Sequence, residues 1–96
     1  MVIVSVDEED GSIKKIKFEG HAAPIVCSAI STLAIATANY IDILNGKVFY
    51  EDDGDTFLTF TVQKSNDTID QILKYMVAML GDIEEEYPKD IKIMRD

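Results

Sequence analysis

The chain has 96 residues, of which 47% are hydrophobic and 28% charged, as expected for one compact domain with its own core. Its 18 acidic and 9 basic residues give a formal net charge of −9. This charge argues against nucleic acid as a ligand, because such binding depends on lysine and arginine contacts to phosphates. A basic protein or peptide is a more suitable partner, although an acidic balance also serves simple solubility. We expect one domain over residues 1–96.

The single cysteine, Cys27, excludes an internal disulfide and is compatible with a reducing compartment. The N-terminal segment has no basic region and becomes acidic at residues 7–10, unlike a signal peptide. The most apolar run, Ile25 to Leu44, is about as long as a membrane span but is interrupted by serine, threonine, asparagine and aspartate. These features predict a cytoplasmic protein without a membrane segment. They also predict a helix buried on several sides, against a sheet and another helix or another subunit.

The first half of the chain is predicted to form a hairpin followed by a long helix. Strands are expected at Val2 to Asp7, with Val2, Val4 and Val6 on one face, and at Ser12 to Glu19, with Ile16 and Phe18 pointing the same way. Asp10-Gly11 lies in the acidic turn that joins them. The helix is expected over Ile25 to Leu44, with Pro24 suited to its first turn and Asn45-Gly46 ending it.

The second half repeats this outline and adds a strand. A second hairpin is predicted from two strands, at Lys47 to Glu51 and at Thr56 to Lys64. The acidic turn that joins them, at 52–55, lacks the ligand spacing of a calcium-binding loop. An amphipathic helix starts near Asn66 and ends before Pro88, and a strand follows at Asp90 to Met94. The order β-β-α-β-β-α-β predicts an α+β two-layer sandwich with two helices on a mostly antiparallel sheet. No metal site or cofactor is expected.

The only histidine and the only cysteine lie at the junction between the second strand and the first helix. A cysteine at a helix N-terminus is placed to form a thiolate, and a histidine just upstream can accept its proton. Unpaired N–H groups of the first helical turn could hold an oxyanion. The arrangement therefore points to Cys27 as nucleophile and His21 as general base and acid, although a lone cysteine is often a buried small hydrophobe.

Two serines on the same helix have an ambiguous role. Ser31 lies one turn after Cys27 on the same helix face, so it could hydrogen-bond near the site or to a substrate. Alternatively, Ser28 and Ser31 are small residues that allow close packing against the helix.

The residues of this junction resemble the signature of the ribosomal-processing cysteine proteases called Prp. The likeness rests on Gly20-His21-Ala22, followed by Ile25-Val26-Cys27-Ser28-Ala29-Ile30-Ser31. The leading hairpin, the second hairpin and the closing helix and strand are also similar over the whole chain. The resemblance implies His21 and Cys27 as a catalytic dyad and Ser31 as a supporting residue, with Gly20, Ala22 and Ser28 beside them.

The resemblance also implies a substrate and an assembly. Members of the family are homodimeric endopeptidases that remove a short N-terminal extension from a basic large-subunit ribosomal protein, the twenty-seventh. This chain departs from the pattern in two ways. Only five residues, Ala22 to Val26, separate His21 from Cys27, whereas the family has a longer, glycine-containing flap, and Pro24 stands where the family usually has aspartate.

Two functional hypotheses follow. The first is the cysteine endopeptidase with its Cys-His dyad. The second is a non-catalytic dimeric module that binds a basic ribosomal protein segment, its shortened link reflecting lost activity. In both cases we expect Ile35, Ile41 and Ile43 to face outward from the first helix and to bury a shared surface in a homodimer.

Overall fold

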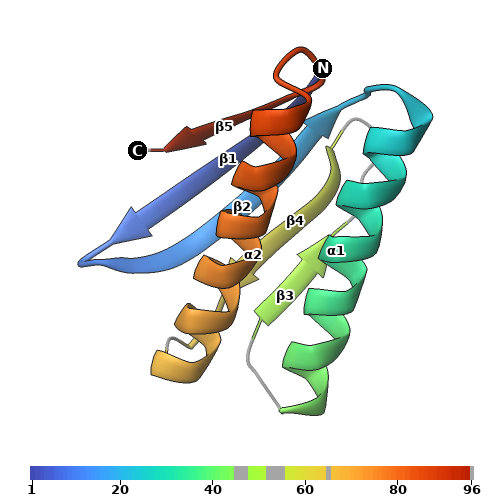
Figure 1. Ribbon diagram of the computed structural model, residues 1–96. Coiled ribbons are helices and arrows are strands. Elements are labelled where there is room, and N and C mark those ends of the chain that lie inside the picture. Colours follow the sequence, from blue (N-terminus) through green and yellow to red (C-terminus); the bar gives the residue numbers. More distant parts are fainter. Residues whose placement is uncertain (45–47, 52–55, 65, 96) are drawn as a thin grey trace.

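The computed structural model describes residues 1–44, 48–51, 56–64 and 66–95. Two helices lie side by side and antiparallel on one face of a single sheet (Figure 1). In chain order the elements are β1 (Val2–Glu9), β2 (Ser12–Gly20), α1 (Pro24–Ile43), β3 (Val48–Glu51), β4 (Thr56–Val62), α2 (Asp67–Glu86) and β5 (Ile91–Arg95). The predicted order and the α+β two-layer class are confirmed. The expected turn at 52–55 and the helix end at Asn45-Gly46 lie outside the described residues.

The five strands follow the order β3-β4-β2-β1-β5. Three neighbouring pairs are antiparallel, and only β1 and β5 run parallel, so the sheet is mostly antiparallel as predicted. The β1–β2 hairpin turns at Asp10 and Gly11, whose φ angles of 54° and 79° are both positive, as a tight two-residue hairpin turn requires. β2 is the central strand, so its last residues lie in the middle of one end of the sheet, where the chain passes on to α1.

The core forms between the sheet and the helices because the strands alternate apolar and polar residues. The expected inward set, Val2, Val4 and Val6 of β1 with Ile16 and Phe18 of β2, is buried. The Phe18 and Phe60 rings meet with centroids 6.1 Å apart in a tilted geometry. The helices contribute buried stripes at three- and four-residue spacing: Val26, Ile30, Ala34, Thr37 and Ile41 from α1, and Ile69, Leu73, Met76, Val77 and Leu80 from α2.

The second helix is anchored at both ends by side-chain hydrogen bonds. At its start the Asn66 side chain accepts a bond from the Ile69 N–H at 2.9 Å, the predicted cap. One turn later Asp70 accepts from the Ile13 N–H at 2.8 Å and pairs with Lys74 at 2.7 Å. Near its end Glu84 accepts from the Ile93 N–H at 2.8 Å. These contacts hold α2 to the β1–β2 hairpin and to the edge strand β5.

One expectation for α1 is wrong. Ile41 does not face outward; it is fully buried, because it continues the stripe of Val26, Ile30 and Thr37 that meets the sheet. Ile35 and Ile43 do face outward and are 59% and 76% exposed, so burial of this face against another subunit stays a prediction. By length and composition α1 alone among the described helices is apolar enough to cross a membrane, but a core helix passes the same test and its buried stripe fits that role.

Candidate active site

A pocket of about 350 Å³ opens where β2 passes into α1. Gly20 and His21 line it from the end of β2, and Cys27 and Ser31 line it from the first turns of α1. Its remaining lining is apolar, from Ala34, Ile35 and Leu58. The structure thus brings the predicted histidine and cysteine to one pocket, with Ser31 beside them as the helical spacing indicated.

Gly20 is required at the end of β2 for two reasons. Its φ of +90° is a conformation that residues with a Cβ rarely adopt. A Cβ at this position would also overlap the backbone carbonyl oxygen of Met1, because Gly20 pairs with Val2 across the hairpin. The next residue, His21, accepts a hydrogen bond on its backbone oxygen from the Met1 amine at 2.6 Å. The backbone next to the histidine is therefore fixed against the start of β1.

The thiol of Cys27 is held by the short link that precedes it. The Ala22 N–H donates to the Cys27 Sγ at 3.2 Å, and the Cys27 thiol donates to the Ala22 carbonyl at 3.4 Å. Cys27 is half-buried, whereas His21 is exposed. Loss of the thiol proton would remove the second bond and strengthen the first, since a hydrogen bond to an anion is stronger than one to a neutral acceptor. Ala22 is thus placed to hold a thiolate.

The expectation of unpaired N–H groups in the first turn is wrong for two of them. The N–H groups of Val26 and Cys27 both donate to the Ala23 carbonyl at 3.0 Å. Pro24, the first helical residue, has no N–H. Among the described residues the N–H directed at the sulfur is that of Ala22, which lies before the helix rather than in it.

The structure separates Ser28 from the other candidate residues. Ser28 does not line the pocket with Cys27; it lies in a hollow between α1 and α2. Leu58 was missed by sequence reasoning, because it comes from β4 and reaches the site only through its pairing with Phe18. Ala34 and Ile35 follow Ser31 by three and four residues, so the helical spacing that selected Ser31 could have found them. No group of three metal-ligating side chains occurs among the described residues.

The fold and the pocket define a small α+β protein with a thiol and an imidazole at one strand-to-helix junction, an arrangement suited to thiol-dependent acyl transfer. Comparison with known proteins identifies the family. Residues 1–92 match the family model described as cysteine protease Prp. The chain belongs to this family.

Relatives and solved structures agree with the assignment. The ribosomal processing cysteine protease Prp of Staphylococcus aureus is 31% identical over 101 aligned positions, which cover 96% of this chain and 94% of the relative. A crystal structure of S. aureus Prp with a covalently linked product peptide is 31% identical with a TM-score of 0.85, and one with a substrate peptide is 25% identical with a TM-score of 0.89. Each covers the whole of both chains. Because the alignment is longer than the 96 residues of this chain, the relative contains residues that this chain lacks.

Proposed function

We propose that this chain is a cysteine endopeptidase that removes the N-terminal extension of the twenty-seventh large-subunit ribosomal protein during ribosome assembly in the bacterial cytoplasm. The observation that carries the proposal is the shared pocket of His21 and Cys27 in a member of the cysteine protease Prp family. The S. aureus Prp structures contain a covalently linked product peptide or a substrate peptide, which supports a peptide substrate for this chain.

The proposed reaction uses the chain's own residues and no cofactor. His21 takes the proton of the Cys27 thiol, and the thiolate attacks the carbonyl carbon of the scissile peptide bond. His21 then gives the proton to the departing amine, which leaves a thioester on Cys27. Water, deprotonated by His21, hydrolyses the thioester and frees the sulfur. Ser31 lies one turn further along α1 in the same pocket, where its hydroxyl can bond the substrate backbone.

The apolar part of the pocket sets the kind of side chain that binds beside the sulfur. Ala34, Ile35 and Leu58 offer no charged group, so a medium-sized apolar side chain of the substrate fits and a charged one is excluded. The five-residue link from Ala22 to Val26 leaves little chain for a mobile cover. We infer that selection in this protein relies on the pocket itself and on contacts beyond it.

The experiment is to incubate the protein with the N-terminally extended ribosomal protein and to weigh the products by mass spectrometry. The proposal predicts one cut that releases the extension, none with Cys27→Ala, and a cut slowed by at least about a hundredfold with His21→Ala. A Ser5→Ala control should cleave at the wild-type rate, because Ser5 lies on β1 and lines neither this pocket nor the hollows between the helices. An intact precursor with the wild-type protein would refute the proposal.

A second function is favoured by the exposed apolar face of α1. Ile25 and Ile43 are 68% and 76% exposed on this helix, and Ile35, which also lines the Cys27 pocket, is 59% exposed. We propose that this face joins two copies, and a dimer could then act as a non-catalytic module that holds a basic ribosomal protein segment. In that case Cys27→Ala would leave binding unchanged and a pull-down with the wild-type protein would recover uncut precursor.

A further inference from the structure

We propose that the seam between α1 and α2 is a second binding surface, distinct from the Cys27 pocket, that takes a basic segment of the same ribosomal substrate outside the cleavage sequence. The inference rests on the proposed function for the identity of the substrate. It predicts that affinity for the whole precursor depends on residues that never approach the scissile bond.

The seam is hollowed along much of its length. One hollow, of about 520 Å³, lies between the C-terminal half of α1 and the N-terminal half of α2. A second, of about 630 Å³, lies between the N-terminal half of α1 and the C-terminal half of α2. Both are lined by Leu33 and Ala36, so they are two parts of one groove. Figure 1 shows the two helices antiparallel on one face of the sheet, and the lining residues of both hollows come from these two helices.

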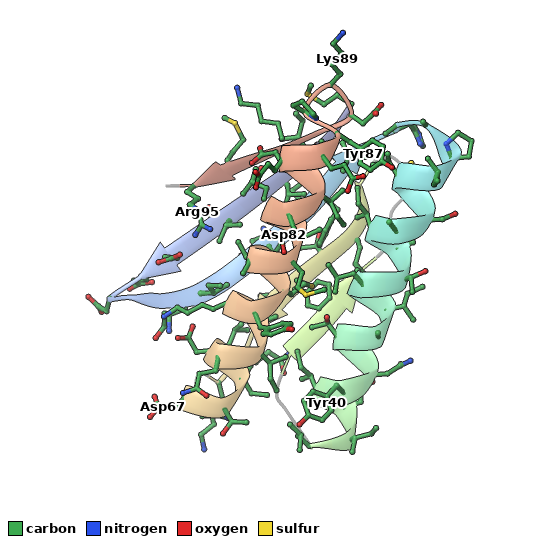
Figure 2. All side chains as sticks on the ribbon, in the orientation of Figure 1. Tyr40, Asp67, Asp82, Tyr87, Lys89 and Arg95 are labelled. Atoms are coloured by element: carbon green, nitrogen blue, oxygen red, sulfur yellow. The ribbon has the colours of Figure 1, made fainter. Side chains whose placement is uncertain are left out.

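The floor and walls of the groove suit a chain with apolar anchors. The α1 side of the groove is lined by small side chains, those of Ala29, Thr32 and Ala36. The α2 side is lined by apolar side chains, those of Ile72, Met79 and Ile83. Tyr40 and Tyr75 line one end and are 53% and 67% exposed, which leaves their rings available to a partner. Figure 2 places Tyr40 near the end of α1 and Asp82 well along α2 toward the opposite end of the groove.

The charge of the helices selects the partner. The two helices carry seven carboxylates, six of them on α2, and one cation, Lys74. Lys74 is already paired with Asp70. Asp82 and Glu86 line the groove itself, and neither has an ion-pair partner among the described residues. A basic segment would supply the missing cations, whereas a second copy of this chain would bring a second acidic surface against the first.

The groove is separate from the catalytic machinery. Cys27, Ser31 and Ile35 line the pocket on one side of α1, while Ser28, Thr32 and Ala36 line the groove on another. Changes in the groove should therefore alter binding of the whole precursor without altering how a short peptide is cut.

The test compares two double charge reversals with equal net charge. The groove variant carries Asp82→Lys and Glu86→Lys. The control variant carries Asp42→Lys and Glu85→Lys, because these two residues are exposed on the same helices and line neither hollow. The dissociation constant for the full precursor is measured in a Cys27→Ala background, so that no cleavage intervenes. We expect the groove variant to weaken binding about tenfold and the control to weaken it about twofold or less.

A kinetic arm uses the active chain with two substrates, the precursor and a synthetic peptide that spans only the cleavage site. The groove variant should raise KM for the precursor and leave kcat and the peptide kinetics unchanged. The inference would be overturned if the groove and control variants weakened precursor binding equally, or if the groove variant slowed cleavage of the precursor and of the peptide equally. It would also be overturned if the groove variant weakened self-association in sedimentation without changing precursor binding. If the wild-type chain does not cleave the precursor but the groove variant still loses precursor binding, the proposed protease activity is refuted and the groove remains a binding surface.

Discussion

Replacement of Gly20 by alanine should damage stability and activity together. The left-handed φ of +90° costs a residue with a Cβ about 1–3 kcal/mol. The added Cβ would also overlap the Met1 carbonyl oxygen, so the backbone at the start of β1 must move. We expect the free energy of unfolding to fall by about 2–4 kcal/mol in total. Because the Met1 amine also bonds the His21 carbonyl, the same movement should displace the histidine and slow cleavage.

Gly11→Ala is the matched control for this prediction. Gly11 has a similar φ of +79°, but a Cβ there meets no atom within 4 Å. Urea unfolding of the two variants therefore separates the free-energy cost of the left-handed φ from the cost of the overlap with Met1. Gly11→Ala should lower the free energy of unfolding by only about 1–2 kcal/mol and keep full cleavage activity. Equal loss of stability in both variants, with Gly20→Ala cleaving at the wild-type rate, would refute the role given to Gly20.

Three further outcomes are expected. Asp70→Ala should lower the free energy of unfolding by about 1–3 kcal/mol at pH 7, since the Ile13 N–H loses its acceptor. Partial burial raises the Asp70 pKa, but the hydrogen bonds from Lys74 and the Ile13 N–H lower it, and the net pKa lies below its usual value. The stabilisation by Asp70 is therefore complete above its unfolded-state pKa of about 3.9 and is lost as the pH falls through its lower folded-state pKa. Urea unfolding should accordingly show a smaller difference between Asp70→Ala and wild type at pH 3 than at pH 7. An amide-to-ester replacement that removes the Ala22 N–H should slow iodoacetamide alkylation of Cys27 about tenfold at pH 7, and an unchanged rate would remove Ala22 from the thiolate site. Ile43→Glu should shift sedimentation at micromolar concentration toward the monomer, and a wild-type chain that already sediments as a monomer would contradict the proposed dimer.

The strands and helices were predictable because their signals are local. The alternation of Val2, Val4 and Val6, the Asp10-Gly11 turn and the Asn66 cap each lie within a few residues of the structure that they specify. The order of strands in the sheet was not predictable in the same way. Pairing of β1 with β5 and of β2 with β4 depends on contacts between distant segments.

The errors in the site have similar physical causes. Ile41 was placed on the outer face because α1 is apolar around most of its circumference, and composition alone does not say which stripe meets the sheet. The helical spacing of Ile41 from Val26 and Ile30 places all three on one face of α1, and this spacing predicts the burial of Ile41 better than composition does. The first-turn N–H groups were expected to be free, but Ala23 precedes the proline and turns its carbonyl toward two of them. Neither the sulfur contact of Ala22 nor the place of Leu58 in the pocket has a local signature.

The proposed reaction requires His21 and Cys27 to act as a pair across a link of five residues. The rate of iodoacetamide alkylation at pH 7 tests this without any substrate. We expect Cys27 to react at least about tenfold faster in the folded chain than in urea, and His21→Ala to remove most of this difference. Alkylation that is no faster in the folded chain than in urea, or that is unchanged by His21→Ala, would contradict the pairing.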